Sequence, residues 1–206
     1  MIIKTIQIGA IGTNCYLVWD EKGGEAFIID PANYTAEIAN TIKDEQLRLK
    51  YIILTHGHGD HTGGVTMLTR EHPEVKLAAG LNEATLLADP NLNYSGEISG
   101  HRLSLKPDIC LSDGDELKVG GMTLTVIETP GHTEGGISIL TDKTLFSGDT
   151  LFRSSIGRTD LPLGDYDALI KSIREKLFVL PDEITVYPGH MGETTIGFEK
   201  AHNPFV

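Results

Sequence analysis

The sequence predicts a mixed α/β (α+β) fold, arranged as a four-layer αββα sandwich of two similar halves. Short β-rich runs are separated by glycine-containing turns, and other segments have apolar residues at helical spacing. The order of strands and helices in the first half recurs in the second. Each half would place its sheet against the other sheet and its helices outside, because both kinds of element must bury one apolar face. The length of 206 residues suits one domain, and we expect residues 1–206 to form it.

Three antiparallel strands are expected at the start of the chain, followed by helices that alternate with single strands. The first runs are rich in β-forming residues and are separated by the turns GAIGT and DEKGGE. The next segment has Ile38, Ile42 and Leu47 close to helical spacing. Pro73 would end the second helix. The expected strands are 2–8, 14–19, 26–30, 51–54 and 76–79, and the expected helices are 34–47, 64–73 and 82–89.

The second half repeats this order of elements. The runs MTLTVIET, GISILT and TLFSG are typical of strands. A long amphipathic segment follows, which places Leu169, Ile173 and Leu177 on one apolar stripe and predicts a helix. The expected strands are 122–129, 136–141, 144–148 and 183–189, and the expected helices are 165–180 and a terminal helix at 192–203.

The composition is that of a globular protein without a nucleic-acid or membrane partner. Net charge is −12, and no cluster of Lys and Arg supplies the basic face that nucleic acid requires. No apolar run approaches the length of a membrane span, and the N-terminus MIIKTIQIG lacks the layout of a signal peptide. We therefore expect a cytoplasmic protein. Cys15 and Cys110 are too few for a disulfide framework, and we expect both to be reduced and buried.

The segment YIILTHGHGDHTGG, residues 51–64, gathers three histidines and an aspartate directly after a buried strand. The glycines between these residues disfavour a helix by about 1 kcal/mol each, so we predict a loop. In extended chain His56 and His58 point the same way. The glycines allow the backbone to curl, so that Asp60 and His61 face a different spot. One loop could therefore supply ligands to two metal positions.

Further candidate ligands follow other strands. His132 comes after MTLTVIE, Asp149 follows TLFSG, and His190 follows ITVYPG, each beside a glycine. This shared placement at strand ends would bring them to one edge of the sheets. A catalytic zinc takes about three protein ligands plus water, so two metals need more ligands than the first loop holds. Nitrogen and oxygen ligands without thiolate suit zinc, and also iron or manganese.

In this order, the motifs THGHGDHTGG, TPGHTEGG, FSGDTLF and PGH resemble those of the metallo-β-lactamase superfamily. The stretches GDTLFRSSIGRTDLP and YPGHMGETTIGFEKAHNPFV are similar to the small, single-domain glyoxalase II-like (hydroxyacylglutathione hydrolase-like) hydrolases. The resemblance implies the αββα fold and two divalent metal ions, foremost zinc. The implied ligands are His56, His58 and His132 for one ion, and Asp60, His61 and His190 for the second, with Asp149 bridging the two.

The resemblance also implies a metal-dependent hydrolase whose partner is a small-molecule thioester. A hydroxyacylglutathione-type thioester would be cleaved by a metal-bound hydroxide, and Asp60 would help to orient the attacking oxygen. Arg158 is a candidate for binding a substrate carboxylate, or else for an ion pair with Asp160 or Asp165. Longer glyoxalase II enzymes have an extra C-terminal helical segment that contacts glutathione. This sequence ends at NPFV, so we expect it to bind the glutathione part of the substrate weakly.

Three other functions fit part of the same pattern. A persulfide dioxygenase would use a single iron on His56, His132 and Asp149, the two-His, one-carboxylate arrangement. A lactonase or β-lactamase would use the same metal chemistry on another carbonyl. A metal-binding partner module without catalysis is disfavoured, because docking alone does not need so complete a ligand set. The oligomeric state is left open.

Overall fold

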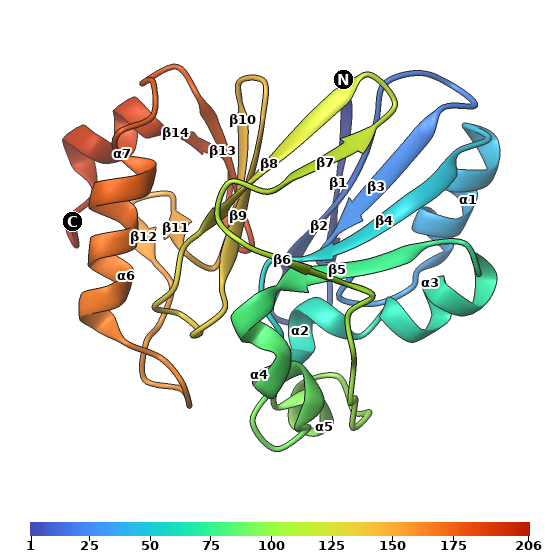
Figure 1. Cartoon of the computed structure of the whole chain (residues 1–206), viewed down its shortest axis with the longest axis horizontal. Coiled ribbons are helices and arrows are strands. Elements are labelled where there is room, and N and C mark those ends of the chain that lie inside the picture. The colour runs from blue at the N-terminus through green and yellow to red at the C-terminus, as the bar shows by residue number, and fades with distance from the viewer.

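Two six-stranded sheets pack face to face in the computed structural model, which describes residues 1–206 (Figure 1). Each sheet begins as an antiparallel meander and then continues with parallel pairing, over three strands in the first sheet and one in the second, so the two halves are similar, as predicted. The first sheet has the spatial order β1 (Ile2–Ile8), β2 (Thr13–Trp19), β3 (Glu25–Ile29), β4 (Arg48–Leu54), β5 (Lys76–Gly80) and β6 (Ile109–Leu111). The second has the order β14 (Thr194–Thr195), β13 (Thr185–Pro188), β10 (Thr144–Gly148), β9 (Ile137–Thr141), β8 (Met122–Glu128) and β7 (Glu116–Val119).

Helices cover the outer face of each sheet, with α6 and α7 on one side of the molecule in Figure 1 and α1 and α3 on the other. Side-chain caps begin several of them: Thr35 accepts a hydrogen bond from the Ile38 backbone and Asp165 from that of Ala168. The helices are α1 (Ala36–Asp44), α2 (Gly59–Thr62), α3 (Val65–Glu71), η1 (Leu81–Glu83), α4 (Ala84–Ala88), α5 (Ser95–Ile98), α6 (Tyr166–Ser172), its π-helical continuation η2 (Ile173–Leu177), and α7 (Ile196–His202). A small ribbon of β11 (Leu151–Phe152) and β12 (Ser155–Ile156) completes the fold.

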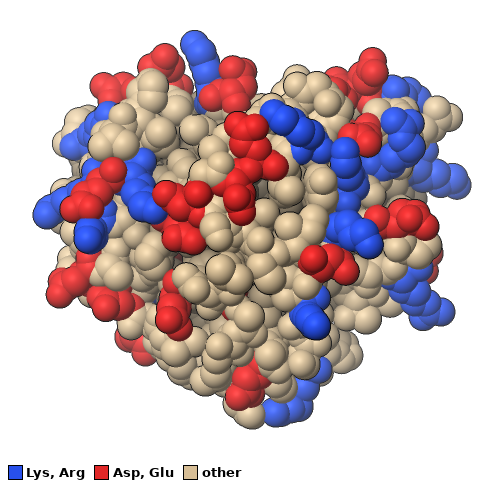
Figure 2. Space-filling view, viewed as in Figure 1, with Lys and Arg blue, Asp and Glu red and all other residues tan.

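Three separate hydrophobic cores account for the four layers. One lies between the first sheet and α1 and α3, one between the two sheets, and one between the second sheet and α6, η2 and α7. Strand β2 shows the arrangement: Leu17 belongs to the outer core and its neighbours Tyr16 and Val18 to the core between the sheets. All seven residues of β2 are buried because both faces of the strand are covered. Figure 2 shows Lys and Arg interspersed with Asp and Glu over the outer surface.

Cross-sheet hydrogen bonds hold the loops at one edge of the sandwich. The Ile137 amide donates to the Thr55 carbonyl at 2.9 Å, which joins β9 to the loop after β4. On β2, the Asn14 side chain donates to the carbonyls of Pro188 and Met191, at 2.9 and 2.8 Å. The loops that follow strands of different sheets are therefore fixed relative to each other, which is the condition for a site built from both halves.

Most of the predicted elements are confirmed, with three differences among the elements and one at a cysteine. The segment predicted as a loop after β4 contains the helical turn α2, because the chain after His58 closes on itself with a hydrogen bond from the His61 amide to the His58 carbonyl. The predicted terminal helix is shorter: residues 194–195 pair as β14, and α7 begins after its cap Thr195. The elements β6, β7, α5, β11 and β12 were not predicted. Cys15 is buried as predicted, whereas Cys110 is exposed.

None of the helices combines the length and the apolar character that a membrane span requires.

Candidate metal centre

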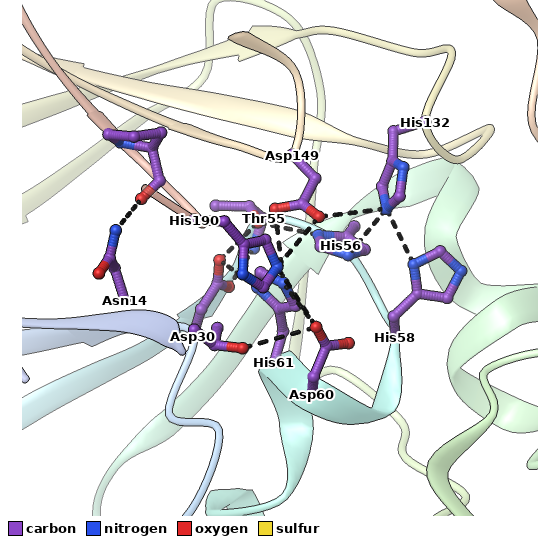
Figure 3. Close-up of polar contacts among 12 residues, drawn as sticks. Asn14, Asp30, Thr55, His56, His58, Asp60, His61, His132, Asp149 and His190 are labelled. Carbon is purple, nitrogen blue, oxygen red and sulfur yellow. Dashed lines mark hydrogen bonds and ion pairs between the residues drawn. The ribbon is translucent and has the colours of Figure 1, made fainter. Parts of the chain in front are cut away.

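Seven side chains from both sheets converge at one edge of the sandwich, as Figure 3 shows. Four come from the loop after β4 and the turn α2, and the other three follow strands of the second sheet. They are His56, His58, Asp60 and His61 from the first loop, His132 after β8, Asp149 after β10 and His190 after β13. The structure thus brings together every residue of the predicted ligand set.

The first cluster consists of the imidazoles of His56, His58 and His132, all of which are buried. The Nε2 atom of His132 lies 2.9 Å from Nδ1 of His58 and 3.2 Å from Nε2 of His56. Burial lowers the pKa of His58 to about 3 and that of His56 well below its usual range. Both rings therefore favour the neutral form, in which one ring nitrogen carries a lone pair that a metal can bind.

Hydrogen bonds behind two of these rings fix which nitrogen faces the cluster. Nδ1 of His132 lies 2.7 Å from the Arg158 carbonyl, so it must donate, and Nε2 carries the lone pair. The Thr55 hydroxyl donates its only proton to Asp30 at 2.6 Å. It must therefore accept from Nδ1 of His56 at 3.1 Å, which again leaves the lone pair on Nε2.

These separations test whether a metal ion fits the first cluster. Zinc–nitrogen bonds of about 2.0–2.1 Å in tetrahedral geometry place two ligand nitrogens about 3.3 Å apart. The observed separations of 2.9 and 3.2 Å are close to this value. The lone pairs on Nε2 of His56 and Nε2 of His132 face each other at 3.2 Å and repel without a cation between them, so the donor set fits a divalent metal.

The second cluster contains Asp60, His61 and His190. The carboxylate oxygen Oδ2 of Asp60 lies 3.3 Å from Nε2 of His190 and 3.5 Å from Nε2 of His61. Nε2 of His61 and Oδ1 of Asp149 face each other at 3.5 Å, and both atoms are buried without a hydrogen-bond partner. Buried, unpartnered acceptors and donors at this spacing are the arrangement that a shared cation satisfies.

The charge balance of the second cluster is opposite to that of the first. Burial alone would lower the pKa of His61, but the carboxylates of Asp60, Asp149 and Asp30 outweigh it and raise that pKa to about 9. Burial would also lower the pKa of His190, but hydrogen bonds to Asp149 and Asp60 outweigh it and raise that pKa to about 10. In turn, these histidines hold the pKa of Asp60 and Asp149 below the usual range, although burial acts to raise it. Two protons therefore occupy the second cluster in the metal-free protein.

Asp149 lies between the two clusters. Its Oδ2 atom is 3.6 Å from Nε2 of His132 in the first cluster and 3.4 Å from Nε2 of His190 in the second. No other carboxylate of the site contacts ring nitrogens of both clusters. This placement fits a carboxylate that bridges two cations.

Asp30 is a site residue that the sequence analysis missed. Its side chain is buried, accepts from the Thr55 amide at 2.8 Å, and lies 2.9 Å from Nδ1 of His61. Because Nδ1 of His61 donates to Asp30, Nε2 is turned toward the second cluster. Asp30 groups closely with His56 and His61, but it acts on the ring nitrogens that point away from the clusters. Its signal in the sequence was the same as that of Asp149, an aspartate directly after an apolar strand, AFIID.

A cleft of about 480 Å³ opens over the clusters. It exposes His58, Asp60, His132, Asp149 and His190 to a bound molecule. Its walls are apolar side chains with one cationic residue, Arg158, and the apolar ones are Ile11, Ile98, Phe152, Ile156, Leu161 and Met191. The exposed guanidinium of Arg158 makes two hydrogen bonds to Asp160, at 2.7 and 2.8 Å. The ion pair proposed with Asp160 therefore exists, at the rim of the cleft.

An αββα sandwich that gathers histidine and aspartate clusters at its strand ends defines a class of metal-binding hydrolases. A family model described as the Metallo-beta-lactamase superfamily matches residues 8–190. The chain belongs to this superfamily and is a metal-dependent hydrolase.

Two relatives cover nearly the whole chain. Hydroxyacylglutathione hydrolase GloC of Haemophilus influenzae is 39% identical over 211 residues, covering 100% of this chain and 98% of the relative. The probable metallo-hydrolase YqgX of Bacillus subtilis is 36% identical over 206 residues, covering 98% and 96%.

Solved structures confirm the fold. The BLEG-1 B3 metallo-beta-lactamase superimposes with a TM-score of 0.90 at 39% identity, covering 99% of both chains. ETHE1 from Myxococcus xanthus has a TM-score of 0.81 at 30% identity, covering 99% of this chain and 84% of that one. TTHA1623 in a di-iron-bound form has a TM-score of 0.83 at 30% identity, covering 98% and 100%.

Proposed function

We propose that the protein is a binuclear metal-dependent hydrolase that cleaves thioesters of the hydroxyacylglutathione type. The observation that carries the proposal is the position of Asp149, whose carboxylate lies within 3.6 Å of ring nitrogens in both clusters, at the floor of the cleft. The near full-length similarity to hydroxyacylglutathione hydrolase GloC supports this substrate class. Zinc suits the nitrogen and oxygen donors, with iron and manganese as alternatives.

Each side chain has a defined part in the hydrolysis. His56, His58 and His132 would hold one ion and Asp60, His61 and His190 the other, and Asp149 would contribute to both. Divalent ions held there would act as Lewis acids toward the thioester carbonyl and lower the pKa of water toward neutrality. Asp60 belongs to the second cluster and also lines the cleft, so its carboxylate can orient the attacking water.

The remaining steps make few demands on the protein. Water adds to the carbonyl carbon, the carbon–sulfur bond breaks, and the products are a carboxylic acid and a thiol. A thiol with a pKa of about 8.5 leaves as its thiolate without a strong general acid. The apolar walls of the cleft would pack against uncharged parts of the substrate. Arg158 is the cationic residue among the lining side chains, and we propose that it binds a substrate carboxylate by exchanging its contact with Asp160.

A second candidate function is persulfide oxidation at a single iron. The positions of His56, His132 and Asp149 support it, because Nε2 of His132 lies 3.2 Å from Nε2 of His56 and 3.6 Å from Oδ2 of Asp149. The second cluster argues for hydrolysis, because a single-iron site would leave Asp60, His61 and His190 without a role. Hydrolysis of a lactone or a β-lactam would use the same two ions.

One experiment separates these functions. The purified protein is loaded separately with zinc, iron and manganese and assayed on S-D-lactoylglutathione, an uncharged 2-hydroxyacyl thioester, a lactone, a β-lactam and glutathione persulfide, the last with an oxygen electrode. We expect thioester hydrolysis to exceed lactone and β-lactam hydrolysis, with no oxygen uptake. Oxygen consumption with the iron-loaded protein, together with absent thioester hydrolysis, would identify a dioxygenase instead.

A further inference from the structure

We propose that Glu83 is a positioning residue for the first metal cluster. Its carboxylate connects the loop of His56 and His58 to the loop of His132 and so sets the positions of these ligands. Glu83 ends the short helix η1, directly after β5, and its side chain is only 1% exposed. It does not line the cleft over the metals. Any effect of Glu83 on the reaction must therefore pass through the residues that it contacts.

Three donors from two loops converge on this one carboxylate. Oε1 accepts a hydrogen bond from the Gly57 amide at 2.7 Å. Oε2 accepts one from the Thr133 hydroxyl at 2.9 Å and one from the Gly135 amide at 3.0 Å. Gly57 lies between two ligands of the first sheet's loop, and Thr133 directly follows the ligand His132. The carboxylate is thus a connection between the two halves of the fold at the point where they share one cluster.

The close packing around Glu83 shows that this connection is specific. A Cβ atom on Gly135 would collide with the backbone of Glu83, and one on Gly57 would meet Leu87 at 3.0 Å and Glu83 Oε1 at 3.3 Å. The loop of His132 therefore lies directly against the backbone of η1, and the loop of His56 and His58 packs against the side chains of Glu83 and Leu87. Because the amide of Gly57 donates to Oε1, the peptide plane between the two ligand histidines is held in one orientation.

Glu83 has no cationic partner to balance its buried charge. Burial raises the pKa of Glu83 to about 7, against the hydrogen bonds of Gly57, Thr133 and Gly135, which lower it. A buried carboxyl without an ion pair is an expensive feature for fold stability alone. Its place is explained if the three hydrogen bonds set the geometry of the ligands on either side. The proposal requires metal at the first cluster but does not depend on the substrate.

Replacement by glutamine tests this role, because an amide cannot reproduce three accepted hydrogen bonds. Its NH₂ group must face either the Gly57 amide or the Thr133 and Gly135 donors, so at least one donor loses its partner. Thr133→Val removes a single donor and keeps the Glu83 carboxyl group, which makes it a milder variant of the same connection.

The chain provides a matched control in Glu199. This residue is also a buried glutamate that accepts three hydrogen bonds: from the Thr194 hydroxyl at 2.6 Å, the Ser154 amide at 3.0 Å and the Asn203 side-chain amide at 2.8 Å. Unlike Gly57 and Thr133, none of these partners is adjacent in sequence to a candidate metal ligand. Glu199→Gln should therefore destabilise the fold in the same way as Glu83→Gln without affecting the first cluster.

The experiment is a cobalt titration of the full chain in a His61→Ala background, in which only the first cluster keeps its full set of histidines. The visible spectrum of bound cobalt reports ligand geometry, and a competing chelator gives the dissociation constant. We expect Glu83→Gln to weaken cobalt binding by about 10- to 100-fold and to change the spectrum. Thr133→Val should cause a smaller shift in the same direction, and Glu199→Gln should match the background protein.

Two results would overturn the proposal. If Glu83→Gln and Glu199→Gln lower the unfolding midpoint alike and both keep the cobalt affinity and spectrum of the background, Glu83 only stabilises the fold. If the background protein itself binds no cobalt, the first metal cluster is wrong and this proposal fails with it. Loss of thioester hydrolysis with an intact cobalt site would count against the proposed substrate and leave the role of Glu83 standing.

Discussion

The two metal clusters differ in how they balance charge before any metal binds. In the first, burial lowers the pKa of His56 and His58, so neutral rings face one another. In the second, carboxylates raise the pKa of His61 to about 9 and of His190 to about 10, so protons occupy the place of a cation. The first cluster can therefore accept a metal directly, whereas the second must exchange protons for it.

This difference assigns separate tasks to the two sites. A cluster of three imidazoles, two of them fixed from behind by Thr55 and by the Arg158 carbonyl, is suited to holding an ion firmly. A cluster that contains Asp60 and opens into the cleft is suited to presenting water to a substrate. Asp149 connects them and balances the repulsion between two cations.

The largest effect is expected on removing the residue that the clusters share. Asp149→Ala subtracts one ligand and one negative charge from both positions, so metal occupancy should fall at both, and hydrolysis by at least about a thousandfold. His61→Ala should empty mainly the second position. Metal per chain after gel filtration at low free metal distinguishes the variants, and an Asp149→Ala protein that keeps two ions would contradict the bridging role.

A smaller effect is expected behind the second cluster. Asp30→Asn weakens the acceptor that orients His61, since the amide offers only one oxygen to the three donors from His61 and Thr55. Metal affinity at the second position should fall by about 10- to 100-fold, while the first position changes less. Competition with a chromophoric chelator measures both constants. Equal losses of metal affinity at the two positions would show that Asp30 does not act specifically on the second cluster.

The clusters should also differ in their response to pH. Below the raised pKa values of His61 and His190, protons compete with metal, so affinity at the second position should fall at least about tenfold when pH drops from 8 to 7. In metal-free protein these raised pKa values stabilise the fold below about pH 6.5, and that stability is lost as pH rises through 9 to 10. Metal titrations at each pH test the first statement. Metal affinities that do not change with pH at either position would contradict the predicted difference between the clusters.

The smallest effect is expected at the rim of the cleft. Arg158→Ala removes an exposed guanidinium that is already paired with Asp160, so KM for an anionic thioester should rise by about three- to tenfold with little change in kcat. KM for an uncharged thioester should stay constant. If both substrates weaken equally, or if only the unfolding midpoint falls, the side chain has a structural role. The His132 contact should persist in this variant, because it uses the Arg158 backbone carbonyl.

Much of the site was predictable because its ligands share a simple pattern. Each follows a strand with an apolar run, all but His61 sit beside a glycine, and strand ends meet at one edge of a sheet. Most strands of the first sheet are buried on both faces, by the outer core and by the core between the sheets. They therefore appear in the sequence as continuous apolar runs. Short elements such as β6 and α5 were missed, since three or four residues hold too little periodicity.

Residues that act from behind the ligands were harder to predict. Asp30 and Glu83 lie far from the first loop in sequence, and only the fold brings them to His61 and Gly57. Glu83 sits in NEATLLAD, where a glutamate on a helix normally faces solvent. Its burial results from the meeting of two loops, which no local pattern encodes. The helical turn α2 was missed because its glycines argue against a helix, whereas tight packing of Gly59 and Gly63 against Ser95 and Ala32 requires them.

The most direct test of this account is a crystal structure of the zinc-loaded protein, with anomalous data collected on both sides of the zinc absorption edge. We predict two anomalous peaks, one enclosed by His56, His58 and His132 and one by Asp60, His61 and His190, with Asp149 contacting both. After soaking at lower pH, the second peak should weaken first. A single peak at saturating zinc across the whole pH range would contradict the binuclear site and the contrast between its two halves.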